Sequence, residues 1–381
     1  MTPLRYLLPG RLISTLVAIA LVLAVACGGA DSSQAAPIVR IPPSSSPNVS
    51  PMAPNAGAAS ETTETTPVWQ QLAPLPFARS EVAVVALRGV IYVIGGLESS
   101  GRTTSRVEAY NPASDVWVEK AALPLALHHV GVAAVGGKIL IVGGFAPGFK
   151  PVDTVFEYDA ETDSWRQRTS MPTARGALAA AVVGDMVYAI GGVTGLGEDN
   201  VASLEVYDPR TDSWKTRAPM PTPRDHLTVG TVGGKIFAIG GRFRHSFGAN
   251  VDANEEYDPV ADTWSSKVML PTARSGIASG VVGELIYVFG GEARSGTFDK
   301  SEVYDPSSDS WTQLPPMPTA RHGMGAAAVD GIIYVVGGGV SPGSADSDAN
   351  EAFYPKTLLW PPPAPCQRAA ASGGGITEPI S

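Results

Sequence analysis

The stretch Ile91-Tyr-Val-Ile-Gly-Gly96 decides the fold of this chain, because close copies of it return five more times. Each copy is a short apolar run that ends in two glycines. The glycine pairs are Gly95-Gly96, Gly143-Gly144, Gly191-Gly192, Gly240-Gly241, Gly290-Gly291 and Gly337-Gly338. Successive pairs lie 47 to 50 residues apart. A period this regular indicates one structural unit repeated six times.

Two strands are expected before each glycine pair. The apolar runs are rich in β-branched and aromatic residues, which favour buried strands. A second apolar or small-residue stretch lies upstream of each run, and short links such as Gly136-Gly137 and Gly184-Asp185 join the two. Such links favour tight hairpins, so the two strands should be antiparallel.

An aromatic residue and a tryptophan follow each glycine pair, always seven residues apart. They are Tyr110 and Trp117, Tyr158 and Trp165, Tyr207 and Trp214, Tyr257 and Trp264, Tyr304 and Trp311, and Phe353 and Trp360. The residues between them, such as Asp208-Pro209, are typical of a tight turn. Each repeat is therefore predicted to hold four strands, and it shows no helical period. Such sheets bury both faces when they stack radially around an axis.

This combination resembles the kelch motif, over residues 67–362. The resemblance implies an all-β fold, a six-bladed β-propeller with four antiparallel strands per blade. Trp69 begins a segment that matches a fourth strand without the three that should precede it. We expect this N-terminal strand to complete the sixth blade and close the ring, which would cover an exposed edge. Trp360 is the alternative closing residue, although prolines follow it.

The ends of the chain predict its compartment. Residues 1–27 have the charge and apolar pattern of a secretory signal peptide. The small residues before Cys27 resemble a bacterial lipoprotein signal, which implies a lipid on Cys27; simple secretion and a retained membrane anchor are the alternatives. Residues 28–66 are predicted to be a disordered linker rich in Ser, Pro, Thr and Ala, and residues 363–381 a flexible tail. We therefore expect an extracytoplasmic protein, either membrane-tethered or secreted.

Charge and cysteine content narrow the range of partners. The net charge is −9 and there is no run of Lys or Arg, so nucleic acid is not expected as a partner. Membrane contact is expected only through the N-terminal lipid or signal anchor. The repeats contain no cysteine, so disulfides do not hold them, and Cys366 in the tail is expected to be an unpaired thiol. No association stripe is visible, and we expect a monomer.

An arginine stands sixteen residues before five of the six glycine pairs, where the innermost strand should begin. These residues are Arg79, Arg175, Arg224, Arg274 and Arg321, with Leu127 in the second repeat. The resemblance to kelch domains that bind acidic peptides implies that these arginines face a ligand at the mouth of the central channel, where they would receive carboxylates.

The same arginines have a structural interpretation. Five repeats carry a glutamate two residues before the aromatic of the third strand, namely Glu108, Glu205, Glu255, Glu302 and Glu351. The repeat that has Leu127 in place of arginine has Phe156 in place of glutamate. This coincidence predicts an ion pair that crosses over the glycines within each blade, replaced in the second blade by an apolar contact.

Residues that break the repeat are the other candidates for function. Glu81, His128, His129, His226 and His322 stand beside the arginine register, and with the arginines they form a candidate ligand-binding set at the channel mouth. A loop after the fourth glycine pair adds Arg242, Phe243, Arg244 and His245 as candidates for recognition. No metal site is expected, because these residues come from separate repeats and show no local ligand spacing.

Two classes of function follow. The leading hypothesis is a non-catalytic recognition module that binds a protein, peptide or glycan through one propeller face, without a cofactor. The alternative is a carbohydrate epimerase or mutarotase, because some bacterial kelch propellers resemble sialic acid epimerases. Such an enzyme would need an acid/base pair, for which Glu81 with His128 or His226 are the candidates. The copper-dependent galactose oxidase type is excluded, because it requires a cysteine crosslinked to tyrosine beside the copper and the repeats contain no cysteine.

Overall fold

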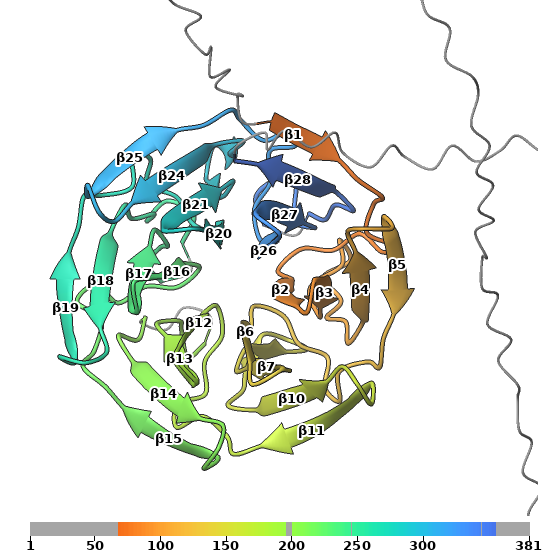
Figure 1. Cartoon of the computed structure of the whole chain (residues 1–381), viewed down its shortest axis with the longest axis horizontal. Helices are drawn as coiled ribbons and strands as arrows, with labels where there is room; N and C mark the ends of the chain where they lie inside the picture. Colours follow the sequence, from red (N-terminus) through yellow and green to blue (C-terminus); the bar gives the residue numbers. More distant parts are fainter. Residues whose placement is uncertain (1–67, 196–199, 245, 344, 356–381) are drawn as a thin grey trace, which may run out of the picture. The chain divides into compact units, whose positions relative to one another are not determined.

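Each predicted repeat forms a four-stranded antiparallel sheet, and the six sheets surround a common axis as the blades of a β-propeller (Figure 1). The computed structural model describes residues 68–195, 200–244, 246–343 and 345–355. The described residues form strands and turns, with no helix among them. The all-β, six-bladed prediction is confirmed.

The first three blades follow the chain outward from the axis. The first contains β2 (Ala83–Leu87), β3 (Val90–Ile94), β4 (Val107–Asn111) and β5 (Val116–Glu119). The second contains β6 (Gly131–Val135), β7 (Lys138–Val142), β10 (Val155–Asp159) and β11 (Ser164–Arg168), with the short ribbon β8 (Phe145–Ala146) and β9 (Lys150–Pro151) between its middle strands. The third contains β12 (Ala179–Val183), β13 (Met186–Ile190), β14 (Leu204–Asp208) and β15 (Ser213–Thr216).

The other three blades repeat this order. The fourth contains β16 (Thr228–Val232), β17 (Lys235–Ile239), β18 (Asn254–Asp258) and β19 (Thr263–Ser266). The fifth contains β20 (Ala278–Val282), β21 (Leu285–Phe289), β24 (Ser301–Asp305) and β25 (Ser310–Gln313), with the ribbon β22 (Glu292–Ala293) and β23 (Gly296–Thr297). The sixth contains β26 (Gly325–Val329), β27 (Ile332–Val336), β28 (Asn350–Tyr354) and β1 (Val68–Gln71).

The first strand of the described chain closes the ring. β1 pairs with β28 in antiparallel orientation (Figure 1). The register sets Trp69 opposite Phe353. The fourth strand of the sixth blade therefore comes from the N-terminal side, as the sequence predicted. Trp360 lies outside the described residues. Closure leaves β28 paired on both sides, and β1 becomes the outer edge strand of the sixth blade, as the fourth strand is in every other blade.

The regular tryptophans fasten each blade to the blade before it. Each indole nitrogen donates a hydrogen bond to a carbonyl just after the outer strand of the preceding blade. The pairs are Trp117 with Ala73, Trp165 with Ala121, Trp214 with Thr169, Trp264 with Ala218, Trp311 with Val268 and Trp69 with Pro315, at 2.8–3.1 Å. This bond gives a physical reason for a tryptophan in every repeat, because the half-buried ring packs on its own blade while its N–H reaches a carbonyl of the preceding blade.

A tyrosine and an aspartate reinforce the same junction in five blades. Tyr257 donates its hydroxyl proton to Asp262 at 2.6 Å, and the same carboxylate accepts the backbone N–H of Ala218 from the preceding blade at 2.9 Å. The equivalent pairs are Tyr110 with Asp115, Tyr158 with Asp163, Tyr207 with Asp212 and Tyr304 with Asp309. Phe353 has no hydroxyl, so the sixth blade lacks this bond.

These aspartates should make the propeller sensitive to acid. The hydrogen bond from Tyr257, followed by that from Ala218, holds the pKa of Asp262 below its usual value of 3.8. A carboxylate whose pKa is lower in the folded chain stabilises the fold above its unfolded pKa, and this contribution is lost as pH falls through the folded pKa. We expect Asp262→Asn to be less stable than the parent at neutral pH, with the difference shrinking below about pH 4. Urea unfolding followed by circular dichroism at several pH values measures this, and a constant difference would contradict it.

The double glycines serve contacts both within and between blades. Gly240 and Gly241 have φ values of +60° and +108°, which side chains rarely adopt. A Cβ on Gly240 would lie 2.9 Å from the carbonyl oxygen of Arg274 in the next blade, and one on Gly241 would lie 3.3 Å from the Cδ of Arg224 in its own blade. The N–H of Gly241 donates to that same carbonyl of Arg274. The first glycine therefore admits the next blade's backbone, and the second admits the backbone carbonyl of Asp225, 2.7 Å from its Cβ position, beside the crossing arginine.

The predictions for the chain ends lie outside the described residues. This applies to the signal peptide with Cys27, the linker at 28–66, and the tail at 363–381 with Cys366. Within the described ranges, no helix has the length and apolar character needed to cross a membrane.

Candidate functional site

The five regular arginines form buried ion pairs within their own blades. The partners are Glu108 for Arg79, Glu205 for Arg175, Glu255 for Arg224, Glu302 for Arg274 and Glu351 for Arg321. All five arginines are 0% exposed. Arg175 also donates to the carbonyl oxygens of Gly191 and Ala189, at 2.9 and 3.1 Å. The predicted pairing across the glycines is therefore present in every blade that has the two residues.

The second blade makes the predicted apolar substitution. Leu127 and Phe156 belong to one buried apolar cluster and are 0% and 6% exposed. The alternative prediction, that the arginines face a ligand at the channel mouth, does not fit this arrangement. Their guanidinium groups are buried, and each is paired with a carboxylate. The residues that break the repeat are left as the candidates that face the axis.

A closed belt of backbone hydrogen bonds surrounds the axis two residues before each innermost strand. The belt residues are Glu81, His129, Ala177, His226, Gly276 and Gly323. From His129 onward, each N–H in the belt donates to the carbonyl oxygen of the belt residue in the preceding blade, at 2.8–3.2 Å, and Val82 N–H donates to Gly323 at 3.3 Å to complete the circle. All six residues have positive φ values, between 52° and 63°. The belt is therefore one backbone position presented six times around the axis.

The side chains at the belt position differ between the blades. Two blades use glycine at this position, which adopts positive φ without a steric cost, and one uses alanine, the smallest residue with a Cβ. Glu81, His129 and His226 adopt the same left-handed conformation, which costs a residue with a Cβ about 1–2 kcal/mol. Non-glycine residues held in such conformations cluster at functional sites. The belt thus marks three ionisable side chains that the fold does not require.

A small cavity of ≈ 110 Å³ lies on the axis, between the belt and the residues that follow it. Glu81, His129 and His226 line it together with apolar side chains such as Val130 and Leu227. Every blade contributes the belt residue and its neighbour to the lining. The sequence-predicted candidates Glu81, His129 and His226 are therefore brought together, although they lie in three different repeats.

Glu81 is the centre of this group. Its Oε2 lies 3.2 Å from Nε2 of His129, and its Oε1 lies 3.5 Å from Nε2 of His322. The side chain is 11% exposed. Burial raises the pKa of Glu81 from its ordinary value of 4.5 to about 7, against the opposing effect of His322. A carboxyl with this pKa exchanges protons near neutral pH, so the site holds a group suited to acid/base chemistry.

A second buried network supports His226. Asp225 Oδ1 lies 2.5 Å from Nδ1 of the imidazole, and Arg242 places Nη2 at 2.8 Å from its Nε2. Arg242 also contacts Asp225 at 3.3 Å and Glu292 at 2.6 Å. Arg242 is therefore part of the axial site, where the sequence had grouped it with a recognition loop.

Glu292 is a site residue that the sequence reasoning missed. It is 1% exposed, and its Oε2 lies 3.5 Å from Nε2 of His322. It stands directly after the fifth glycine pair, a position that holds Leu97, Phe145, Val193, Arg242 and Gly339 in the other blades. The sequence signal for Glu292 was its charge at a position that is mostly apolar in the other repeats. Arg242 shows the same signal and was the one residue at this position that the sequence analysis included among its candidates.

The remaining predicted residues surround this centre. His128 is 0% exposed and its ring packs beside His129, with centroids 4.7 Å apart, and close to Phe149. Phe243 is 39% exposed, and the backbone N–H of Arg244 donates to the side-chain oxygen of Asn200. His245 lies outside the described residues. The predicted recognition loop therefore contributes Arg242 to the site, while Phe243 reaches the surface.

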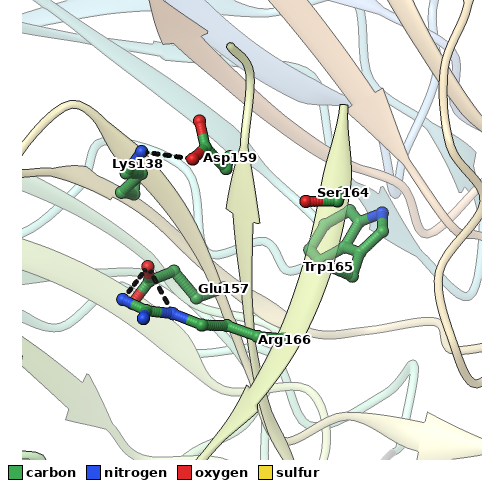
Figure 2. A pocket seen from close by; sticks show the side chains of 6 residues that line it. All are labelled: Lys138, Glu157, Asp159, Ser164, Trp165 and Arg166. Atoms are coloured by element: carbon green, nitrogen blue, oxygen red, sulfur yellow. Dashed lines mark hydrogen bonds and ion pairs between the residues drawn. The ribbon is translucent and has the colours of Figure 1, made fainter. Parts of the chain in front are cut away.

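A second pocket lies on the outer part of the second blade. Figure 2 shows its six lining residues, Lys138, Glu157, Asp159, Ser164, Trp165 and Arg166. Lys138 contacts Asp159 at 2.7 Å, and Arg166 contacts Glu157 at 2.5 Å. Lys235 makes similar contacts with Glu256 and Asp258 in the fourth blade. The charges of this pocket are mutually paired and recur in another blade, so they favour the axial site as the functional one.

Comparison with known proteins agrees with this architecture. A family model described as the KLHDC2/KLHL20/DRC7 Kelch-repeats domain matches residues 59–241 and 213–338, and a Kelch motif model matches residues 320–367. The chain belongs to the kelch-repeat family. A comparison with curated proteins found no significant sequence match.

Among solved structures, this kelch propeller is similar to the one described as "Structure of YjhT". The TM-score is 0.64 at 15% sequence identity, and the match covers 73% of this chain and 95% of that chain. At this identity the likeness shows a shared fold, and a fold does not fix a function. The function of this kelch propeller must therefore be argued from its own axial residues.

Proposed function

We propose that this kelch propeller is an extracytoplasmic recognition module, which binds a protein, peptide or glycan by inserting a polar group of that partner into the axial cavity. The main support for this proposal is the belt of residues with positive φ. Three blades place Glu81, His129 and His226 against the cavity, and the other three have alanine or glycine at the same position. Kelch propellers generally mediate protein binding, which supports a macromolecular partner.

The charges at the axis favour a cationic or hydroxyl-bearing partner group. The regular arginines are paired with glutamates, and Arg242 is in contact with both Asp225 and Glu292. A carboxylate of a partner would meet carboxylates already present there, and the arginines that the structure describes at the axis, the five regular ones and Arg242, already have carboxylate partners. An ammonium, guanidinium or sugar hydroxyl can instead donate hydrogen bonds to Glu81 and the imidazoles. The cavity of ≈ 110 Å³ suits one side chain or one edge of a sugar.

The extracytoplasmic part of this proposal is supported by the sequence of residues 1–27, which has the pattern of a secretory signal. The lipoprotein-like residues before Cys27 support tethering to a membrane through a lipid. Mass spectrometry of the purified protein tests both features, because cleavage and lipidation change the N-terminal mass in distinct ways.

A carbohydrate epimerase or mutarotase is the second candidate. One observation favours it: the Glu81 carboxyl is flanked by two imidazoles, at 3.2 Å from His129 and 3.5 Å from His322. Opening and reclosing a sugar ring needs one group that takes a proton and another that gives one. The partners considered for Glu81 from the sequence were His128 and His226, whereas the distances of 3.2 and 3.5 Å join Glu81 to His129 and His322.

The test of the recognition module is binding of the purified full chain to arrays of glycans and of peptides with basic or neutral side chains. For any hit, we expect Glu81→Ala and His129→Ala each to weaken binding at least about tenfold, as for central residues of an interface. Lys138→Ala, in the outer pocket, is the matched control and should bind like the parent. Full binding by both axial variants would reject the axial site.

NMR exchange spectroscopy separates the two candidates for any sugar that binds. Faster exchange between the sugar's anomeric forms, lost in Glu81→Gln, would support the enzyme and overturn the non-catalytic module. Binding without faster exchange would support recognition alone.

A further inference from the structure

Three belt residues bring together the donor atoms of a metal site. One donor atom each from Glu81, His129 and His226 lies within 4.8 Å of the others. Ligand atoms around a tetrahedral zinc ion are about 3.3 Å apart, given bonds of about 2.0 Å. Closing the gap requires movements of up to about 1.5 Å, which changes in side-chain torsion angles can supply while the belt backbone stays in place. Two histidines and one glutamate are a donor set known from catalytic zinc sites.

The groups around the two histidines suit this role. Nδ1 of His226 contacts the carboxylate of Asp225 at 2.5 Å, and Nδ1 of His129 contacts Nδ1 of His128. Metal-binding imidazoles commonly use one nitrogen for the metal and the other for such a partner, which fixes the ring. The Nε2 atoms are then the metal-facing atoms, and Nε2 of His129 already points at Glu81.

The charge balance at the axis also favours a cation. Two buried carboxylates, Asp225 and Glu292, contact one guanidinium, that of Arg242, and the carboxyl group of Glu81 lies close enough to interact with all three. Arg242 donates toward Nε2 of His226, so a metal ion must displace that hydrogen bond while Arg242 keeps its two carboxylate partners. His322 lies 3.5 Å from both Glu81 and Glu292, and can serve as a further ligand. A divalent cation would offset the excess of negative charge.

We propose that Glu81, His129 and His226 bind one divalent transition-metal ion, zinc by preference, with an open coordination position toward the axial cavity. Imidazole ligands select zinc, copper or nickel over magnesium and calcium, which prefer oxygen ligands. The cavity at the remaining position would let a partner's polar group or a water molecule complete the coordination. This inference goes beyond the proposed function and does not depend on it, because the metal alone is the probe.

The experiment is a zinc titration of the purified full chain after treatment with EDTA, by competition with a chromophoric chelator. We expect one zinc per chain, and tetrahedral cobalt(II) should give intense visible absorption in the same site. His129→Ala and His226→Ala should each weaken zinc binding by more than the roughly 10–100-fold that loss of an outer partner causes. Both variants copy Ala177, which occupies the same left-handed position in the third blade, so the fold should tolerate them.

Thermal unfolding of each variant checks this tolerance, and Lys138→Ala is the control that should bind zinc like the parent. Glu81→Gln keeps the size of the side chain and provides a second test that does not disturb the histidines. The site is supported if the parent binds one zinc ion per chain and these three variants lose that binding. Absence of zinc binding, or unchanged binding in the variants, overturns it. Partner binding that persists in EDTA would separate the proposed function from the metal, since each can fail without the other.

Discussion

Replacing Glu205 with alanine should destabilise the propeller by about 3–5 kcal/mol, the usual cost of leaving one member of a buried ion pair without its partner. Arg175 is 0% exposed and donates to Glu205 at 2.6 Å. Burial lowers the pKa of Arg175 and the negative charge of Glu205 acts against that effect. The variant would keep the carbonyl acceptors of Gly191 and Ala189 but lose the only carboxylate in contact with the guanidinium among the described residues. Urea unfolding at neutral pH measures the loss.

The second blade supplies a matched control for this prediction. There the positions of Thr173, Arg175 and Glu205 are taken by Leu125, Leu127 and Phe156, which pack in one apolar cluster. The triple variant Thr173→Leu, Arg175→Leu, Glu205→Phe transfers that solution to the third blade. Replacing a buried ion pair by well-packed apolar residues is often neutral or stabilising, so the triple variant should recover most of the lost stability. A loss near zero for Glu205→Ala, or a triple variant as unstable as the single one, would contradict the ion-pair model.

The fold was readable from the sequence because each repeat carries its own local signals. The apolar runs, the turn residues and the tryptophans are present in nearly every copy, so an error in one copy is corrected by the others. The covariation of Leu127 with Phe156 even predicted which side chains meet across the glycines. What the sequence did not reveal is that the first glycine also makes room for the next blade, since that contact joins residues of different repeats.

The candidate site was only partly readable for the same physical reason. Glu81, His129 and His226 stood out because they break the repeat, but their distances depend on how the blades are arranged around the axis. The metal-ligand geometry was not expected, because donors from three blades have no fixed spacing along the chain. Glu292 was missed because it acts from the register directly after the glycines, where a charged residue is easily taken for a loop residue.

Replacing Trp69 with alanine should destabilise the fold by about 3 kcal/mol and also open the ring. Trp69 packs against Phe289 and Phe353, with centroids 5.3 and 5.0 Å apart, and donates its indole N–H to Pro315 of the fifth blade. It therefore ties β1 to β28 and also joins the fifth and sixth blades. When β1 detaches, β28 loses its outer partner and presents an unpaired edge, a known site of aggregation. Unfolding curves and light scattering during storage measure the two effects.

Trp165→Ala is the matched control, because Trp165 makes the same kind of hydrogen bond, to Ala121, and packs on Tyr158. Its strand β11 is joined to β10 by a tight turn, so the loss of the indole weakens the blade without freeing the strand. β1, in contrast, has no such turn to β28 and is held to it by pairing and packing. We therefore expect both variants to lose stability, but only Trp69→Ala to aggregate and to exchange the β28 amides rapidly. Equal aggregation and exchange in the two variants would mean that closure of the ring does not depend on the packing of Trp69.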